Sequence, residues 1–510
     1  MTNPDGLARD AGDLASFGYD QQLRRRLGSY ASFAAGFSFV SILTTVFQLF
    51  FFGFSFGGAS FFWTWPIVFG GQLLVACCFA ELATRYPISG CIYQWSRRLS
   101  TPTFGWFAGW TMLIAQIVTV SAAAIALQVV LPTVWSGFQL VGHDSALTST
   151  DGATNAVLLG AILVTLTTIV NAVGVRAMAT INSIGVTCEL IGVVLLVILL
   201  FANAERGPGA VLHSTGAAPH HSYLGVFVIS ALMAAYVMVG FDSAGELSEE
   251  THNPRRTAPK AIIGALCVSG IGGALLLLAA IMAAPSLTSG DLSTVGLPYV
   301  LTAALGTTLG KIFLVDVAIA VCVCTLAIQT AASRMLFSMS RDNMLPGSAA
   351  LSRVSATTGA PVLPAIVVGV LAVAVLVVNV GEASVFTALA SVCIVLLYAA
   401  YLMVTVPLLV ARLRGRLAPQ TEPGLFSLGR LGVPVNVLAI IYGAAMMINL
   451  VWPRASVYDP AGGHPLLQWF APLFVLATAL SGVIAFLVHR PHRYFAPAPA
   501  PAAATAGAQA

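Results

Sequence analysis

The chain has 510 residues, of which 58% are hydrophobic and only 8% are charged, and its formal net charge is +4. A soluble domain carries about a quarter charged residues, so this composition excludes a water-soluble globular protein and requires a bilayer to cover the apolar surface. Residues 1–30 are polar and the first apolar run is long enough to span a membrane, so no secretory signal is expected. The eight cysteines show no metal-ligand spacing with histidines, and we predict neither a disulfide framework nor a metal site.

Long apolar stretches recur along the chain. Each crossing of a hydrocarbon core about 30 Å thick needs about 20 apolar residues. In chain order the stretches are 31–55, 60–84, 104–131, 153–173, 178–203, 223–248, 260–284, 311–338, 362–380, 384–411, 432–452 and 467–489. They predict an all-α integral membrane protein with about twelve transmembrane helices. The Ala/Pro repeat of residues 495–510 is predicted to be a disordered tail.

The positive charges indicate how these stretches run, because Lys and Arg accumulate in cytoplasmic loops. With the N-terminus inside, only Arg206, Lys311 and Arg454 fall outside, which leaves 20 of the 23 Lys and Arg residues on the cytoplasmic side. We therefore expect a multi-pass protein of the cytoplasmic membrane with both termini in the cytoplasm.

Two stretches in corresponding places, the first and the sixth, are not uniformly apolar. Residues 36–45 place small and hydroxylated side chains in the middle of the first stretch, and residues 236–246 place glycine and a carboxylate in the middle of the sixth. Unwound backbone at membrane depth is tolerated where it lines a cavity or is buried in protein. Interrupted segments in matching positions of two halves predict a transporter site between them. The alternative is that the small residues only allow close helix packing.

Two carboxylates inside predicted spans are functional-site hypotheses, because an ionisable group is costly there. Asp242 lies beside the expected break of the sixth stretch, and Glu189 lies in the fifth with no basic residue nearby in sequence. We predict that both take part in coupling, with a proton gradient favoured over a sodium gradient as the energy source. For Glu189 the alternative is a protonated carboxyl group bonded to neighbouring backbone.

Charged residues at the cytoplasmic ends of the spans predict a gate. The residues assigned to it are Glu81, Arg85, Glu249, Glu250 and Arg255. Ion pairs among such residues could close the inner side and open when the sixth helix moves. A static role in fixing the loops is the alternative.

The remaining function classes lack the residues that they need. The histidines all lie in loops or at the ends of predicted spans: His143, His213, His220, His221, His252, His464, His489 and His492. An integral membrane enzyme would need a nucleophile–base pair or a metal cluster within the spans, so no catalytic residue is predicted. No cofactor and no nucleic-acid partner are expected. Beyond a small-molecule substrate and the lipid bilayer, the sequence indicates no partner and no oligomeric state.

Four separate motifs stand out along the chain: Phe17 to Ser38; Ala80-Glu81-Leu82-Ala83-Thr84-Arg85-Tyr86-Pro87 with the loop after it; Gly240-Phe241-Asp242 with Asn253-Pro254-Arg255-Arg256-Thr257; and Ser340-Arg341-Asp342-Asn343-Met344-Leu345-Pro346. They resemble motifs of the amino acid–polyamine–organocation (APC) superfamily, and more closely those of its amino acid/choline transporter branch. The motifs occur in the family's order and cover the first eight spans.

The resemblance implies a LeuT-like fold of two inverted five-helix repeats with two peripheral helices. The expected parts are an N-terminal arm at 1–30, repeats at 31–203 and 223–411, and two C-terminal helices at 432–489. It also implies secondary active transport by alternating access, with the substrate between the first, third, sixth, eighth and tenth helices. The expected substrate is an amino acid taken up with protons. A polyamine, choline or a GABA-type amine, or amino-acid exchange, is the alternative.

The resemblance also assigns substrate-binding residues. In the first helix these are Ser41, Ile42, Leu43, Thr44 and Thr45, whose backbone N–H groups would meet the substrate carboxylate. Many relatives have a glycine pair or Ser-Gly where this chain has Thr44 and Thr45. In the other helices the residues assigned are Gln116, the aromatic gate Tyr236, Val239, Gly240, Phe241, Asp242 and Gln329. For Gln116, an ordinary interhelical hydrogen bond is the alternative.

Overall fold

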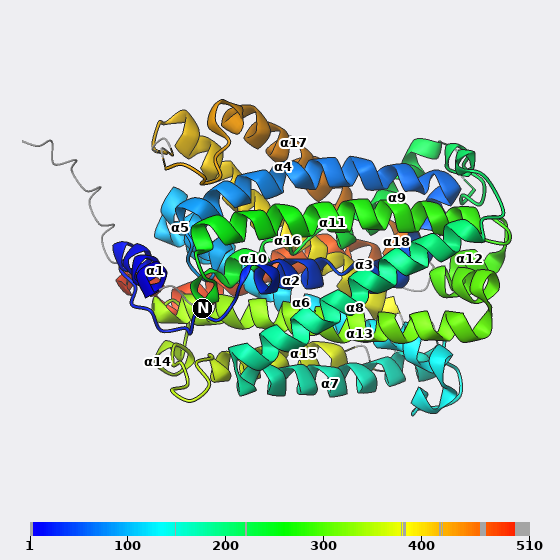
Figure 1. The fold of residues 1–510 in the computed structure, drawn as a ribbon, viewed down its shortest axis with the longest axis horizontal. Helices are drawn as coiled ribbons and strands as arrows, with labels where there is room; N and C mark the ends of the chain where they lie inside the picture. The colour runs from blue at the N-terminus through cyan, green and yellow to red at the C-terminus, as the bar shows by residue number, and fades with distance from the viewer. Residues whose placement is uncertain are drawn as a thin grey trace, which may run out of the picture.

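The computed structural model describes residues 4–147, 149–219, 222–378, 380, 384–417, 420, 422–458 and 466–494, with the side chains of 4–7 and 384–391 left out. Within these ranges the chain is built from helices that run side by side along the long axis of the molecule (Figure 1). The predicted tail at 495–510 lies outside the described residues.

A helix lies on each predicted apolar stretch. Their bounds are α2 Ser29–Val40 and α3 Ile42–Gly57, α4 Thr64–Arg85, α6 Pro102–Val134, α7 Thr150–Val173, α8 Val175–Ala202, α9 Tyr223–Val237 and α10 Ser243–Glu246, α11 Pro254–Ala283, α13 Leu297–Arg341, α15 Val362–Val377, α16 Ser384–Leu413, α17 Gly432–Val451 and α19 Phe470–His489. Among the described residues, nine helical segments are long and apolar enough to cross a membrane. The exact number of spans stays a prediction.

Shorter helices close the two ends of the bundle. The arginine-rich end carries α1 Pro4–Ser16, α5 Cys91–Leu99 and α14 Ser348–Leu351, and the opposite end carries α12 Gly290–Thr294 and α18 Ala455–Tyr458 (Figure 1). Arg24 donates to the carbonyl of Thr357 and Arg255 pairs with Glu422, so loops that are far apart in sequence meet at the arginine-rich end. The basic loops therefore gather at one end of the bundle, and the side of the membrane that this end faces stays a prediction.

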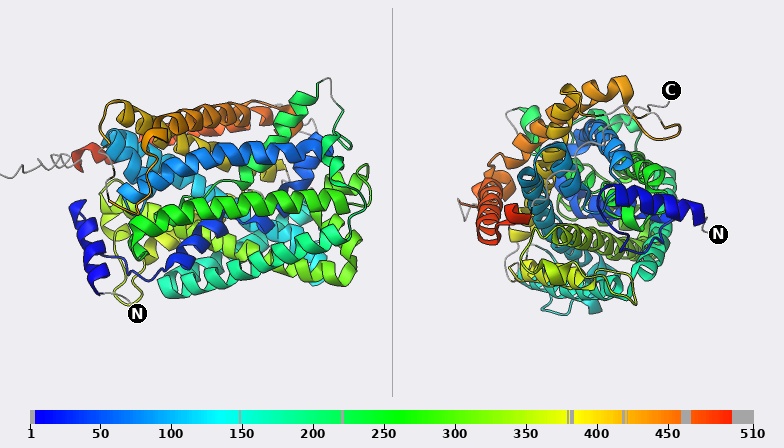
Figure 2. Two further views of the ribbon diagram at one scale, coloured as in Figure 1. Left: turned by 45° about the horizontal axis from the view of Figure 1, so that its top comes forward. Right: turned by 90° about the vertical axis from the view of Figure 1, so that its left-hand side faces the viewer.

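The core of the bundle and its periphery differ in burial. In their most apolar stretches, 89% of the residues of α6 are buried, against 28% for α17 and 17% for α19. The two C-terminal helices therefore pack on the outside of the bundle (Figure 2). Large apolar side chains on the outer helices are exposed, including Ile162, Ile191 and Ile484. Exposed apolar surface on many helices is what a bilayer would cover.

Candidate functional site

The first span is broken at one residue. Ser41 separates α2 from α3 with a left-handed φ of 36° and a ψ of 94°. Such a conformation is strained for a residue other than glycine and needs compensating contacts. Thr45 supplies one, since its hydroxyl donates to the carbonyl oxygen of Ser41 over 2.7 Å. The predicted break is present, and its unwound part is shorter than the five residues assigned.

Glu189 of α8 occupies the N-terminus of α3. Its Oε1 accepts the backbone N–H of Leu43 over 3.1 Å and lies 2.9 Å from the hydroxyl of Ser41. A helix N-terminus offers free N–H groups and positive dipole charge, so a carboxylate is stabilised there. Glu189 is 1% exposed, and its Oε2 has no hydrogen-bond partner in the described structure.

A chain of hydroxyls leads from Glu189 to the next turn of α3. The Ser41 hydroxyl lies 2.7 Å from that of Thr44 as well as 2.9 Å from Glu189. A serine has a single hydroxyl proton. When Ser41 donates to Glu189, the Thr44 hydroxyl is therefore the donor to Ser41. A change of charge on Glu189 would reorient both hydroxyls.

The sixth span is interrupted between α9 and α10, over residues 238–242. Gly240 has a φ of 89°, and a Cβ there would lie 1.7 Å from a ring carbon of Phe39, so no other residue fits. The N–H of Gly240 donates to the phenol oxygen of Tyr401 over 2.9 Å, and that phenol donates to Asp242 Oδ1. Tyr401 of α16 thus holds this break in place.

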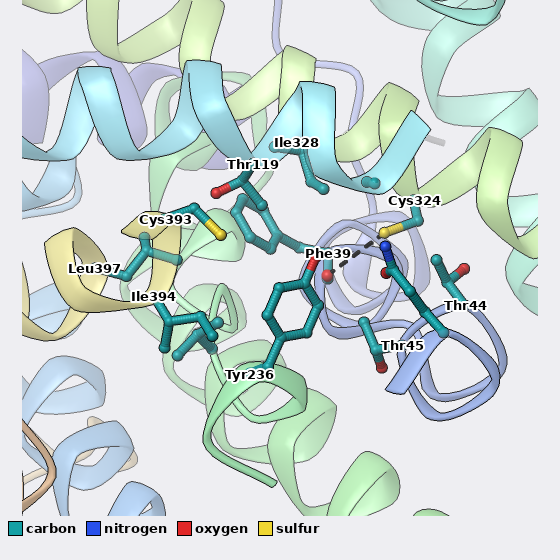
Figure 3. A pocket seen from close by; sticks show the side chains of 13 residues that line it. Phe39, Thr44, Thr45, Thr119, Tyr236, Cys324, Ile328, Cys393, Ile394 and Leu397 are labelled. Carbon is teal, nitrogen blue, oxygen red and sulfur yellow. Dashed lines mark hydrogen bonds between the residues drawn. The ribbon is translucent and has the colours of Figure 1, made fainter. Parts of the chain in front are cut away.

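A closed cavity lies between the two breaks. Its wall is formed by Phe39, Thr44, Thr45, Gln48, Thr119, Ala123, Tyr236, Val239, Cys324, Ile328, Cys393, Ile394 and Leu397. Thr119 and Cys393 face Thr44 and Thr45 across it, with Tyr236 below (Figure 3). The free volume is about 10 Å³, which is about what one water molecule needs. The structure is therefore occluded, and a larger guest requires the helices to move apart.

The predicted binding residues divide into two groups. Thr44, Thr45, Tyr236 and Val239 line the cavity wall. Ser41, Ile42 and Leu43 lie outside that wall, and the first and last of them contact Glu189. Gly240 and Asp242 bind Tyr401, and the ring of Phe241 packs against that of Tyr401 at 5.5 Å.

Two predicted glutamines are not brought to the cavity. Gln329 donates to Thr168 over 2.6 Å and also bonds to Thr167, so it links α13 to α7. Gln116 is fully buried in α6, and its amide has no hydrogen-bond partner in the described part of the chain. The hydrophobic pattern did not reveal Gln48, Thr119 or Tyr401. Their only signal is a polar side chain within an apolar helix.

The acidic residues of the predicted gate have partners other than those expected. Glu249 forms two bonds of 2.8 Å with Arg341, and Glu250 lies 2.9 Å from Arg334. Both arginines belong to α13, and neither is among the predicted gate residues. These pairs tie the segment after α10 to the end of α13, because that segment turns back under the bundle.

The other predicted gate residues lie apart from these pairs. Glu81 pairs with Arg85 at 2.9 Å and also with Arg412 of α16. Arg255 pairs with Glu422, whose side chain is 59% exposed, so it belongs to the periphery of this end.

The N-terminal arm contacts residues of the predicted gate and their partners. The N–H groups of Arg26 and Leu27 donate to the carbonyl of Glu250 over 2.8 and 2.9 Å. The Tyr19 hydroxyl donates to Asp342 over 2.9 Å, and the Arg341 guanidinium lies 4.0 Å from the centre of the Tyr19 ring. Burial, followed by the charge of Asp342, raises the pKa of Tyr19 to about 12, so its hydroxyl stays a donor at neutral pH.

A compact set of possible metal ligands lies beside the sixth-span break. Atoms of Cys91, Asp242 and Glu246 lie within 4.8 Å of one another, and all three residues are buried. Spacing alone could not reveal this set, because Cys91 is about 150 residues away from the other two in sequence. The fold therefore brings together a possible metal site that the sequence did not predict.

Comparisons with known proteins find similarity to amino acid permeases. A family model described as amino acid permease matches residues 27–477. The chain is 27% identical to the amino-acid permease BAT1 of Arabidopsis thaliana, over 87% of this chain and 88% of that protein. It is 24% identical to amino-acid permease 2 of Neurospora crassa, over 97% and 91%. It is also 27% identical to the methylthioribose transporter of Bacillus subtilis, over 54% and 58%.

The fold has a solved counterpart. The chain resembles MhsT in its crystal structure with L-phenylalanine, with a TM-score of 0.56 at 13% identity, covering 82% of this chain and 98% of that one. The expected LeuT-like fold is thereby confirmed.

Proposed function

Because the chain belongs to the amino acid permease family of the APC superfamily, we propose that it moves a small, net-neutral amino acid across a membrane by alternating access, coupled to a proton. The chain is a multi-pass membrane transporter and its relatives are permeases, not enzymes. The closed cavity between the two helix breaks carries the proposal, because its largely apolar wall also holds hydroxyl groups and lies between two interrupted helices.

The cavity wall supports a substrate without net charge. Its polar groups are hydroxyls, thiols and one amide, and none of its residues is charged. A cationic amine held there would lack a carboxylate partner, because Asp242 lies outside the wall and bonds to Tyr401. A zwitterion carries both charges itself, and the apolar part of the wall, with Val239 and Leu397, suits a small or apolar side chain.

Glu189 supports proton coupling. Its carboxylate takes the Leu43 N–H, which is the kind of donor that a substrate carboxylate would need. An ionised Glu189 and the substrate carboxylate therefore compete for the N-terminus of α3. Protonation of Glu189 removes its charge and weakens its hold on that N-terminus. The substrate carboxylate then takes its place, so that proton and substrate bind together.

Alternating access requires that one end open while the other stays closed. The pairs of Glu249 with Arg341 and of Glu250 with Arg334 join the segment after α10 to α13 at the arginine-rich end, and in the proposed cycle they hold that end closed. In the proposed cycle, binding at the two breaks shifts α10 and the residues after it. The buried pairs then part and water enters.

A second substrate class is favoured by one observation. A wall without charged residues also fits an uncharged polar solute, and one relative is named a methylthioribose transporter. Uptake measurements separate the two classes.

The proposed function is tested by uptake of a radiolabelled panel into proteoliposomes. Neutral amino acids, lysine, glutamate, a polyamine and an uncharged pentose derivative would be compared. Val239→Trp fills the cavity and should abolish uptake, whereas Val268→Trp adds the same ring on the exposed face of α11 and should leave it intact. We expect uptake of neutral amino acids alone. Uptake of a charged amine, or uptake that survives Val239→Trp, would refute the proposal.

A further inference from the structure

One thiol and two carboxylates lie close together where α5 meets α10, from Cys91, Asp242 and Glu246. The Sγ of Cys91 lies 3.4 Å from Glu246 Oε1 and 3.7 Å from the carbonyl oxygen of Asp242. All three residues have 0% exposure. The cluster lies at the border between the sixth-span break and the helix that follows the second span.

Each carboxylate of the cluster keeps one oxygen without a donor. Asp242 Oδ2 and Glu246 Oε2 are buried and have no hydrogen-bond partner among the described residues. Tyr401 donates only to Oδ1 of Asp242. In the described structure no ion pair includes either carboxylate, although several pairs form within the same end of the bundle. The Cys91 thiol and the backbone N–H groups of Gly90 and Cys91 bond to Glu246, so one oxygen of each carboxylate is partnered and the other is not. A buried carboxylate oxygen without a partner is unfavourable, so the cluster favours a cation or protons.

The ligand set selects the kind of cation. A thiolate with two carboxylates suits Zn²⁺, whereas Ca²⁺ and Mg²⁺ take oxygen ligands. Zinc binds sulfur at about 2.3 Å and carboxylate oxygen at about 2.0–2.2 Å, which in a tetrahedral site sets the ligands roughly 3.5 Å apart. The 3.4 Å between Cys91 and Glu246 already matches that separation. We propose that Cys91, Asp242 and Glu246 form a binding site for Zn²⁺ or a similar borderline-soft divalent cation.

The proposed site lies between two helices, so a bound ion would link them. Cys91 is the first residue of α5, Asp242 immediately precedes the short helix α10, and Glu246 is the last residue of α10. A bound ion would join α5 to α10. In the proposed cycle α10 moves away from the rest of the arginine-rich end when that end opens. Zinc therefore holds that end closed and slows transport. This consequence rests on the proposed function, whereas binding of the ion does not.

Cobalt provides the test of binding, because Co²⁺ substitutes for Zn²⁺ and gives an ultraviolet thiolate-to-metal absorption band. The purified full-length protein would be titrated with Co²⁺ and then with Zn²⁺. We expect one Co²⁺ per chain with the thiolate band, displacement by Zn²⁺, and release of the thiol proton on binding. Absence of the band in the unmodified protein would overturn the proposal, and protons alone would then fill the cluster.

Matched variants locate the ion. Cys91→Ser should abolish the thiolate band and weaken binding at least about tenfold, and Glu246→Gln should weaken binding while the thiolate contribution remains. Cys267→Ser removes a half-buried cysteine of α11 that is not part of the cluster, and it should bind Co²⁺ as the unmodified protein does. A band that survives Cys91→Ser, or one that is lost in Cys267→Ser, would contradict the site. Zinc inhibition of uptake is measured separately, so a failed transport assay leaves the binding result intact.

Discussion

The buried ion pair between Glu250 and Arg334 offers a sharp test of the proposed gate. The two side chains are 0% and 1% exposed, and Arg334 Nε lies 2.9 Å from Glu250 Oε1. Glu250→Gln keeps the shape but leaves a guanidinium without its counter-ion. Breaking a buried pair in this way costs about 3–5 kcal/mol. Because water can reach Arg334 once this end opens, most of that cost falls on the closed state. At about 1.4 kcal/mol per factor of ten, the closed-to-open ratio should fall by roughly a hundredfold or more.

The labelling rate of the native cysteine Cys324 measures how often one end of the bundle opens. Cys324 lines the central cavity and is 1% exposed, so a maleimide reaches it only when one end opens. In Glu250→Gln the labelling rate of Cys324, followed by mass spectrometry, should rise steeply until the open form dominates. Glu422→Gln breaks an exposed pair with Arg255 at the same end and is worth at most about 1 kcal/mol, so labelling should change less than about fivefold.

The double variant Glu250→Gln with Arg334→Gln separates gating from unfolding. It removes both charges, so the uncompensated guanidinium is gone and labelling should fall back toward the original rate. Equal labelling of Cys324 in the original protein and in Glu250→Gln would refute the reasoning. So would an increase in Glu422→Gln of the same size as in Glu250→Gln.

Two further substitutions probe the sixth-span break. Gly240→Ala places a Cβ 1.7 Å from a ring carbon of Phe39 at a φ of 89°. It should lower the free energy of unfolding by about 1–3 kcal/mol, measured by thermal unfolding in detergent. The control Gly225→Ala, where no heavy atom lies within 4 Å of the added Cβ, should be nearly neutral. Tyr401→Phe leaves the Gly240 N–H and the Oδ1 of Asp242 without their phenol partner. It should lower the free energy of unfolding by about 1–3 kcal/mol and reduce uptake. The control Tyr494→Phe, on the surface, should change neither. A stable, fully active Tyr401→Phe would show that the phenol does not hold the break.

The sequence predicted the architecture well, for physical reasons. Apolar runs long enough for a bilayer locate the helices, and hydroxyls or glycine within such a run mark where a helix stops. Both breaks were found in this way, at Ser41 and at Gly240. The exact length of the first break was not, because it depends on Glu189 and Thr45 capping the freed backbone groups.

Contacts between segments that are distant in the chain could not be predicted from the sequence. Glu189 and Leu43 are 146 residues apart, and no periodicity links them. The acidic residues Glu249 and Glu250 of the predicted gate pair with Arg334 and Arg341 of α13. In the sequence these two arginines resemble ordinary charges at the end of a span, so the pairs could not be predicted. The side chain of a polar residue in an apolar helix can point either to a cavity or to a neighbouring helix, and the sequence does not distinguish the two. Gln329 was predicted at the cavity, and in the structure its side chain points toward α7.

The central claim is that a proton on Glu189 and a neutral amino acid bind together between the two breaks. It is tested most directly by uptake of the transported amino acid into proteoliposomes with and without an outside-acid pH gradient, for the original protein and for Glu189→Gln. The amide mimics the protonated carboxyl group and cannot carry a proton. We predict that the gradient drives accumulation in the original protein, and that Glu189→Gln binds and exchanges substrate without responding to pH. Accumulation by Glu189→Gln that still follows the pH gradient would contradict the account.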